Sequence, residues 1–175
     1  MKKGIIVIDA DKCLSCKSCE IACYVNRTVT KNLYGAIKET SISKGIFIEN
    51  IPDKKNKFGL SVSVPLQCRH CEDAPCIKVC PTKALKRTND DSPVLIDNEL
   101  CIGCKECVMV CPFGVITFDT RKKAVIKCDL CIERLKNDDV PACVAACPTK
   151  CIKFESIEKL TKGKRKKYLV EMCEK

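Results

Sequence analysis

Four closely spaced cysteines are the first candidates for chemistry in this 175-residue chain. They are Cys101, Cys104, Cys107 and Cys111, at the spacing C-x2-C-x2-C-x3-C, and Pro112 follows the last one. Thiolates at this spacing are typical ligands of a [4Fe–4S] cluster. Three of them can close around one face of the cluster, whereas the fourth lies one helical turn further on and points to a neighbouring cluster. Pro112 ends the turn because it has no N–H group to continue a helix.

Three further runs of four cysteines accompany this one. They are Cys13, Cys16, Cys19 and Cys23; Cys68, Cys71, Cys76 and Cys80; and Cys128, Cys131, Cys143 and Cys147. The first run has the same spacing but ends in Tyr24 instead of proline, and the other two have longer central gaps and end in Cys-Pro-Thr-Lys. The flanks repeat as well, since residues 8–13 correspond to residues 96–101 at an offset of 88. If the first and third runs are called type A and the second and fourth type B, the order A–B–A–B indicates duplication of a two-cluster unit.

If the fourth cysteine of each run crosses over to the neighbouring cluster, sixteen cysteines form four ligand sets. The predicted sets are Cys13, Cys16, Cys19 and Cys147 (cluster one); Cys128, Cys131, Cys143 and Cys23 (cluster two); Cys68, Cys71, Cys76 and Cys111 (cluster three); and Cys101, Cys104, Cys107 and Cys80 (cluster four). The first and last runs must then meet in space and enclose the middle pair. This arrangement ties the two ends of the chain together and couples folding to cluster loading.

Two cysteines remain, and the chain has a single histidine. Cys151 aligns with the apolar Ala84 and Val115 of the other runs, so we interpret it as a small buried apolar residue. Cys173 has no neighbour at metal-ligand spacing and receives the same interpretation. For His70, inside the second run, local hydrogen bonding or surface exposure is the leading interpretation, and a proton relay or cluster ligation is the alternative.

Structural zinc is the main chemical alternative, because paired C-x2-C elements also build four-cysteine zinc sites. The triplets Cys13–Cys19 and Cys101–Cys107, each followed by a fourth cysteine, favour iron–sulfur instead. A disulfide scaffold is less favoured, because so many cysteines in a reducing cytosol indicate metal binding. An enzyme with its own substrate site is another alternative, but no nucleophile–base pair, phosphate-binding loop or pterin signature stands out.

Composition leaves a thin apolar interior. The apolar share of 46% includes cysteine, and it falls to roughly 36% without it, which is low for a conventional core. Four clusters, each carrying −2 with its thiolates, would lower the formal charge of +10 to about +2. The lysine excess is therefore weak evidence for nucleic acid. No stretch approaches the ~20 apolar residues of a membrane span, and Ile5–Ile8 is too short for a signal peptide, so we expect a cytoplasmic protein without a membrane span or a nucleic-acid partner.

Short elements are expected to position the cysteine runs. Predicted strands are Ile5–Ile8, Val94–Ile96, and a pair at Ile116–Phe118 and Ala124–Ile126 around a turn at Arg121–Lys123. The cysteine-free insertion between the first two runs predicts a helix at Asn32–Glu39 and a hairpin of Ile46–Ile48 and Leu60–Val64 around a turn at Pro52–Gly59. This insertion is interpreted as a lid over one cluster, with a partner-docking surface as the alternative.

The C-terminal tail predicts two helical pieces. Ser156 is a candidate N-cap, Gly163 is expected to break the first piece, and Lys164–Glu174 is expected to form a final helix. The face formed by Tyr168, Leu169, Met172 and Cys173 is expected to pack on the body of the same chain, with a subunit contact as the alternative.

Three segments carry a resemblance to a known family, namely Cys68–Cys76 (CRHCEDAPC), Val110–Gly114 (VCPFG) and Lys127–Cys131 (KCDLC). Over nearly its whole length the chain resembles the four-cluster ferredoxin-like electron-transfer subunits of anaerobic oxidoreductases. The resemblance implies an α+β fold of two intertwined ferredoxin-like two-cluster domains, with short strands and helices wrapped around the clusters. It also implies four [4Fe–4S] clusters, since Cys104 is present, and electron transfer without a catalytic site of the chain's own.

The expected boundaries follow the cysteine runs. Residues 1–45 and 121–155 form an outer two-cluster domain, residues 66–120 an inner one, residues 46–65 a hairpin insertion, and residues 156–175 a helical tail. The segments Cys19–Cys23 and Lys31–Ile37 look most like the iron–sulfur partner of carbon monoxide dehydrogenase. That resemblance implies relay of electrons between such a catalytic subunit and a second redox partner such as a hydrogenase. A formate dehydrogenase, a hydrogenase or another molybdenum or tungsten oxidoreductase is the alternative partner.

Overall fold

Short helices and strands make up a mixed α+β fold, as predicted. The computed structural model describes residues 3–39, 44–52, 61–89, 92–121 and 123–173, without the side chains of 167, 168, 170, 171 and 173. The helices are η1 (Ala10–Lys12, a 3-10 turn), α1 (Ser18–Arg27), α2 (Leu33–Lys38), α3 (Pro75–Lys78), α4 (Glu106–Val110), α5 (Ile132–Lys136), α6 (Ala142–Ala145) and α7 (Ile157–Cys173). The strands are β1 (Ile5–Ile8), β2 (Ile46–Pro52), β3 (Ser61–Gln67), β4 (Leu85–Lys86), β5 (Leu95–Ile96), β6 (Thr117–Asp119), β7 (Ala124–Ile126) and β8 (Ile152–Glu155).

The described strands form four separate antiparallel pairs, which are β1 with β8, β2 with β3, β4 with β5, and β6 with β7. The predicted strand at Ile5–Ile8, the strand at the end of Val94–Ile96, the β6–β7 pair and the hairpin are confirmed. The turn predicted at Pro52–Gly59 lies outside the described residues from residue 53 onward, as do Leu60 of the hairpin and Lys122 of the β6–β7 turn.

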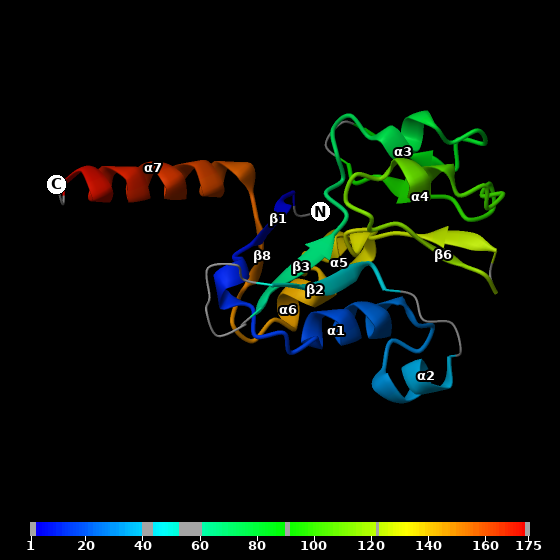
Figure 1. Cartoon of the computed structure of the whole chain (residues 1–175), viewed down its shortest axis with the longest axis horizontal. Coiled ribbons are helices and arrows are strands. Elements are labelled where there is room, and N and C mark those ends of the chain that lie inside the picture. Colours follow the sequence, from blue (N-terminus) through cyan, green and yellow to red (C-terminus); the bar gives the residue numbers. More distant parts are fainter. Residues whose placement is uncertain (1–2, 40–43, 53–60, 90–91, 122, 174–175) are drawn as a thin grey trace.

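Pairing of β1 with β8 joins the beginning of the chain to the segment that follows the fourth cysteine run. The register extends from Ile5 opposite Glu155 to Ile8 opposite Ile152. The first and last runs therefore lie together, as ligand sharing requires. Figure 1 shows α3 and α4 beside the part formed by α1, α6, β1 and β8, and not inside it. The predicted enclosure of the middle runs is wrong, because each pair of runs closes its own two-stranded sheet.

Two groups of buried residues form the described interior. One consists of Cys19, Cys23, Ile46, Cys143, Cys147, Cys151 and Ile152. The other consists of Ala74, Cys76, Leu85, Val94, Cys107, Ile116 and Val125. The first group draws on both ends of the sequence, whereas the second comes from the middle runs and from Val125 in β7. Cysteines dominate the first group, which agrees with the thin apolar interior expected from composition.

The backbone repeats the duplication seen in the sequence. Ser15 and its counterpart Gly103 have φ of 55° and 71°, and Lys17 and its counterpart Lys105 have φ of 57° and 66°. A non-glycine residue at positive φ costs about 1–3 kcal/mol and persists only where its surroundings fix it. At Gly103 a Cβ would lie 2.9 Å from the carbonyl oxygen of Lys123. The two A-type runs therefore adopt the same loop conformation.

The hairpin is fastened to the first and fourth runs. Glu20 in α1 accepts hydrogen bonds from the backbone N–H of Ile48, at 2.7 Å, and from Lys44, at 2.8 Å. Gly45 lies so close to the fourth run that a Cβ would come within 2.8 Å of the Cα of Cys128. The base of the hairpin therefore covers the region where these two runs meet.

Helix α2 confirms the prediction at Asn32–Glu39. The side chain of Asn32 caps it by accepting a hydrogen bond from the backbone N–H of Gly35 at 2.8 Å. The hydroxyl of Tyr24 in α1 donates to the carbonyl oxygens of Ala36 and Glu39, at 2.6 and 3.0 Å. These contacts attach α2 to α1 and leave its outer face exposed.

The tail forms one continuous helix, so the predicted break at Gly163 is wrong. Ser156 caps its beginning through a 3.3 Å hydrogen bond from the N–H of Lys159, as predicted. An isolated glycine costs a helix only about 1 kcal/mol, and good helix formers surround Gly163. Glu174, the last residue of the predicted helix, lies outside the described residues.

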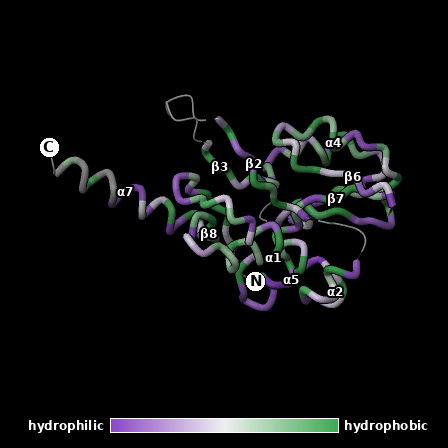
Figure 2. Tube along the Cα trace, turned by 60° about the horizontal axis from the view of Figure 1, so that its bottom comes forward, coloured by the Kyte–Doolittle hydropathy of each residue, from purple (hydrophilic) through white to green (hydrophobic). Residues whose placement is uncertain are grey.

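Helix α7 projects away from the rest of the molecule (Figure 1). Leu169 and Met172 are 60% and 57% exposed, so the expected packing of this face on the chain's own body is wrong for these two residues. The side chains of Tyr168 and Cys173 lie outside the description. Hydrophilic and hydrophobic residues alternate along α7 in Figure 2, and no helix among the described residues has the length and apolar character needed to cross a bilayer.

Candidate metal centres

Three cavities are each lined by one of the predicted cysteine sets. One is lined by Cys13, Cys16, Cys19 and Cys147, a second by Cys68, Cys71, Cys76 and Cys111, and a third by Cys80, Cys101, Cys104 and Cys107. They contain 280, 320 and 310 Å³ of unfilled space, part of it open to solvent. In each cavity the fourth cysteine comes from the other run of its pair. The structure therefore brings together the cysteines of the predicted sets for clusters one, three and four.

The remaining set, Cys23, Cys128, Cys131 and Cys143, is buried throughout. Burial raises the pKa of Cys143, and negative charge on Cys128, Cys131 and Cys23 raises it further. The N–H of Gly45 donates to Cys23 at 3.2 Å, and a Cβ on Gly45 would lie 3.1 Å from the Cβ of Cys128. The structure therefore places Cys23 of the first run close to Cys128 of the fourth, as the predicted set for cluster two requires.

Four thiols around a shared cavity have the donor chemistry that a [4Fe–4S] cluster requires. The described cysteines are free thiols. Within the described parts of the chain, no three His, Cys, Asp or Glu side chains are grouped to hold a single metal ion. The thiols are distributed around each cavity instead, and the other residues that line the cavities are mainly apolar. The residues present fit the cluster that the sequence predicts.

Burial determines the protonation of several of these thiols. It raises the pKa of Cys19 and of Cys107 to about 11, and that of Cys128 to about 12. For Cys80 and Cys147 burial acts in the same direction, but hydrogen bonds from backbone N–H groups outweigh it, so the pKa of each lies below its ordinary value. Because metal ligands must be deprotonated, loading of the more buried thiols releases protons.

Hydrogen bonds reach the sulfur atoms of the candidate ligands. The backbone N–H of His70 donates to Cys68 at 3.4 Å, and the N–H of Leu130 donates to Cys128 at the same distance. Cys68 and Cys128 are each the first cysteine of a type B run, so the backbone repeat extends to the type B runs as well. Cys131 accepts from the side-chain amide of Asn26 at 3.6 Å. Hydrogen bonds to cluster sulfurs are one of the means by which a protein sets reduction potential.

Two cations lie near cluster two, and their positions could not be read from the cysteine spacing. Arg27 is largely buried, donates to the carbonyl oxygen of Lys127, and lies 3.3 Å from the carboxylate of Asp129. Lys127 is 2% exposed. In the sequence, only the position of Lys127 directly before Cys128 indicates that it lies near a cluster site.

His70 is partly buried and is held by hydrogen bonds. Its Nδ1 accepts from the backbone N–H of Val94 at 3.1 Å. Burial, aided by the charges on Lys127 and Arg87, lowers the pKa of His70 to about 3, so the ring is neutral at pH 7. Local hydrogen bonding, one of the two parts of the leading interpretation, is therefore confirmed, and the residue is only partly exposed.

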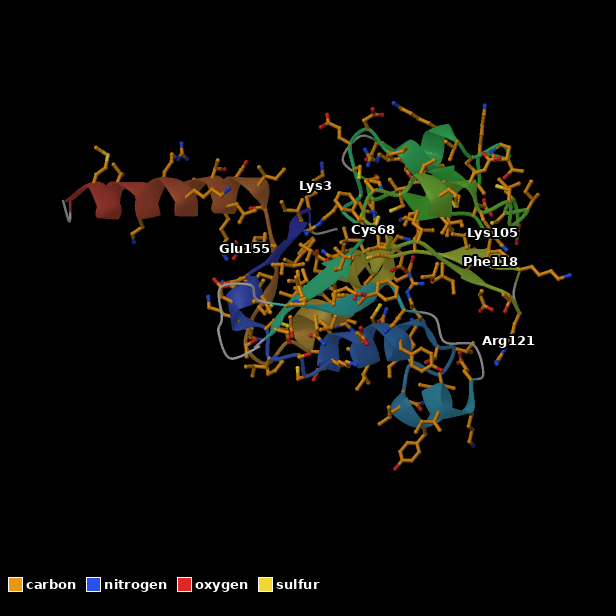
Figure 3. The ribbon with its side chains drawn as sticks, viewed as in Figure 1. Lys3, Cys68, Lys105, Phe118, Arg121 and Glu155 are labelled. Carbon is orange, nitrogen blue, oxygen red and sulfur yellow. The ribbon has the colours of Figure 1, made fainter. Side chains whose placement is uncertain are left out.

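Arg87 was not singled out by sequence reasoning. Its guanidinium donates to the carbonyl oxygens of His70, Cys71 and Glu72. These three contacts fix the loop that carries the first two cysteines of the second run. Cys68 lies where β3 leads into this loop, near the middle of the view in Figure 3.

Cys151 is 1% exposed and lines the cavity of cluster one beside Cys13 and Cys147. Its counterpart Ala84 is buried to the same extent and lines the cavity of cluster four. The predicted burial of Cys151 is confirmed. Its side chain is nevertheless a fifth thiol at the site of cluster one. The alignment of Cys151 with Ala84 did not predict this position.

Exposure differs among the four sets. Cys16 of cluster one and Cys104 of cluster four are exposed, whereas the four cysteines of cluster two are buried. Lys105 follows Cys104 directly, and its ammonium lies 4.5 Å from the ring centre of Phe118 (Figure 3). The sites of clusters one and four therefore have ligands at the surface.

Comparison with protein families agrees with this geometry. A family model described as a 4Fe-4S dicluster domain matches residues 61–157, and another described as a 4Fe-4S binding domain matches residues 10–26. This chain belongs to the 4Fe-4S dicluster family. As a member of it, the chain is a multi-cluster ferredoxin-like electron-transfer protein that binds several [4Fe–4S] clusters, and four clusters are consistent with the match.

Three relatives extend the comparison. An "Iron-sulfur protein" of Rhodospirillum rubrum is 40% identical over 169 residues, which cover 88% of this chain and 83% of that protein. The "Electron transport protein HydN" of Escherichia coli is 36% identical and covers 93% and 95% of the two chains. The B subunit of the anaerobic dimethyl sulfoxide reductase of Escherichia coli is 34% identical and covers 89% and 74%. These names describe electron carriers and a reductase subunit, and they agree with the predicted lack of catalytic activity.

Proposed function

We propose that this chain relays electrons through four [4Fe–4S] clusters between a catalytic subunit and a second redox partner. The observation that carries the proposal is that each of three cavities is lined by one complete cysteine set predicted from crossed ligation. When bound, the clusters supply one-electron redox chemistry. The chain's own residues hold the clusters, limit access of water and set their potentials through hydrogen bonds and charge.

The proposed ligands are the four sets named above, and the proposed order along the molecule is cluster one, two, three and four. Cys19 of cluster one influences the pKa of Cys143 of cluster two, which indicates that these sites are neighbours. Lys127 influences the pKa of both Cys128 of cluster two and Cys76 of cluster three. The exposed Cys16 and Cys104 then lie at opposite ends of the relay, where partners can exchange electrons with it.

The proposed domain organisation pairs the cysteine runs in the same way. Residues 1–45 and 121–155 form the outer two-cluster domain, and residues 66–120 form the inner one, with the hairpin 46–65 and the tail 156–175 attached. The two groups of buried residues support this division in part, because Val125 of the proposed outer domain packs with the group from the middle runs. The ligand sharing within each pair is the form of intertwining that we propose.

The proposed catalytic partner is a carbon monoxide dehydrogenase, and a hydrogenase is a candidate second partner. The residues that carry this resemblance, Cys19–Cys23 and Lys31–Ile37, lie on α1 and α2. Leu33, Tyr34 and Ile37 of α2 are 56%, 84% and 75% exposed, and exposed apolar patches mark interaction sites. The insertion thus has two proposed roles. The hairpin base covers clusters one and two, and α2 contacts a partner.

A molybdenum or tungsten oxidoreductase is the second candidate partner. The similarity to the B subunit of dimethyl sulfoxide reductase favours it, and formate dehydrogenase and hydrogenase stay alternative partners on the sequence resemblance. We further propose a cytoplasmic location and no nucleic-acid partner. The balance of lysine charge by anionic clusters supports the latter.

Iron and acid-labile sulfide analysis of anaerobically purified protein tests the cluster content. We expect about sixteen irons and sixteen sulfides per chain. About four of each, or zinc without visible charge-transfer absorption, would overturn the proposal. Anaerobic pull-down with the tagged chain tests the partner, and recovery of a molybdenum enzyme instead of a carbon monoxide dehydrogenase would select the second candidate.

A further inference from the structure

Lys127 occupies an unusual place for a lysine, because its side chain is almost wholly buried between the two proposed domains. It follows β7 directly, and 2% of its surface is exposed. The ammonium donates hydrogen bonds to the carbonyl oxygen of Cys128, at 2.7 Å, and to the carbonyl oxygen of Val94. Lysines are rarely buried to this extent unless another charge compensates them.

The two carbonyl groups belong to two different cluster sites. Cys128 is a member of the cluster-two set, whereas Val94 lines the cavity of cluster three together with Cys68, Cys71, Cys76 and Cys111. The N–H of Val94 is held in turn by His70, which lines the same cavity. The ammonium of Lys127 therefore lies between the sites of clusters two and three.

Its compensating charge is not a carboxylate. Among the ion pairs of the described residues none includes Lys127, whereas the neighbouring Arg27 is paired with Asp129. Backbone carbonyls supply dipoles but no net charge. Removing an isolated ammonium from water is unfavourable even after the surrounding protein relaxes. The anionic clusters on its two sides are the charges that can offset this cost, since each carries about −2 with its four thiolates.

We propose that Lys127 is a positioning residue for electron transfer. Its buried positive charge stabilises an added electron on clusters two and three, and so assists electron transfer from one domain to the other. The inference rests on the proposed ligand sets. Reduction makes a cluster more negative, and a fixed positive charge in a water-poor site favours that state. Lys127 therefore raises the reduction potentials of clusters two and three relative to a neutral side chain.

Three variants separate charge from hydrogen bonding. Lys127→Gln removes the charge but retains an amide that can donate to the same carbonyls. Lys127→Met removes both, and Lys127→Arg retains the charge. Lys78→Met is the matched control, because Lys78 lies in α3 near Cys76 and Cys80 but its side chain is 64% exposed, where solvent screens its charge.

The measurement is a redox titration of the anaerobic full-length protein, followed by electron paramagnetic resonance. We expect two of the four clusters in Lys127→Gln and Lys127→Met to become about tenfold harder to reduce, which corresponds to about 59 mV for one electron. Lys127→Arg and Lys78→Met are expected to keep the wild-type potentials.

The outcomes distinguish this inference from the proposed function. A wild-type protein without about sixteen irons would overturn the proposed function itself. With full iron present, unchanged potentials in Lys127→Gln overturn the inference, and so does a shift confined to the clusters with exposed ligands. Should both neutral variants lose the iron of two sites while Lys127→Arg keeps it, the charge is required at those sites, which supports the inference.

Discussion

The backbone N–H of Asp9 donates to the carbonyl oxygen of Cys151 at 2.9 Å. The N–H of Asp97 donates to Ala84 in the same way, at 2.8 Å. Each bond extends a two-stranded sheet beside a cluster cavity, so Cys151 and Ala84 occupy equivalent places in the duplicated fold. Because alanine occupies one of these two places, the fold and the cluster site do not require a cysteine there.

Cys151→Ala is therefore expected to keep all four clusters. Loss of the buried sulfur leaves a small cavity, which costs about 1 kcal/mol of unfolding free energy. Cys147→Ala is the control, because it removes a proposed ligand from the same cavity. Iron analysis and visible absorption distinguish the two variants. A deficit of about four irons in Cys151→Ala would show that this fifth thiol is a ligand.

Crossed ligation makes a prediction about pairs of variants. Cys68 and Cys111 line one cavity, whereas Cys104 lines another. Iron losses are expected to add in the Cys104→Ala, Cys111→Ala double variant, since two clusters are damaged. They are not expected to add in the Cys68→Ala, Cys111→Ala double variant, since both changes damage one cluster. The reverse pattern of iron content would mean that each run keeps its own fourth cysteine.

Arg87→Met is expected to make cluster three labile. The guanidinium holds three carbonyl oxygens of the loop at residues 70–72, and hydrogen bonds from a charged donor contribute about 1.5–3 kcal/mol each. The rate of iron loss to a chelator should rise for about one quarter of the iron. Arg87→Lys should give an intermediate rate, because an ammonium cannot reproduce the planar set of donors. Substitution of the exposed Arg69, in the same run, is the control. Equal rates of iron loss in the Arg87 and Arg69 variants would contradict this role of Arg87.

The cysteine runs and most short elements could be predicted from the sequence, because they depend on local spacing. The C-x2-C runs, the Asn32 cap and the alternating hairpin strands each involve residues close in the chain. The contacts of Asn26, Arg87 and Lys127 with the cluster sites could not be predicted in this way. Asn26 contacts Cys131, and Lys127 contacts Val94, across long sequence separations that only the folded chain brings together.

Two of the failed predictions show different physical reasons for failure. Enclosure of the middle runs assumed that ligand sharing alone determines the arrangement, whereas the β1–β8 and β4–β5 pairs give each half its own closure. The prediction of a break at Gly163 overestimated the effect of a single glycine, since the neighbouring residues favour the helix.

The continuity of α7 at Gly163 can itself be tested. Apart from its chain neighbours and the backbone of α7 itself, no described atom lies within 4 Å of the position where a Cβ would stand, so Gly163→Ala should fit without strain. We expect a gain of about 1 kcal/mol in helix stability and a stronger far-ultraviolet helical signal, with unchanged iron content. Gly163→Pro should weaken that signal by interrupting the helix. Identical spectra for all three proteins would show that this segment is not helical in solution.

Removal of iron by a chelator is expected to unfold both halves of the molecule. The interior near clusters one and two consists mainly of cysteines, with Ile46 and Ile152, so little apolar contact remains without the metal. Circular dichroism should show loss of folded structure on chelation and recovery when iron and sulfide are restored. A chelated protein that still unfolds cooperatively at the original temperature would show that side-chain packing alone maintains the fold.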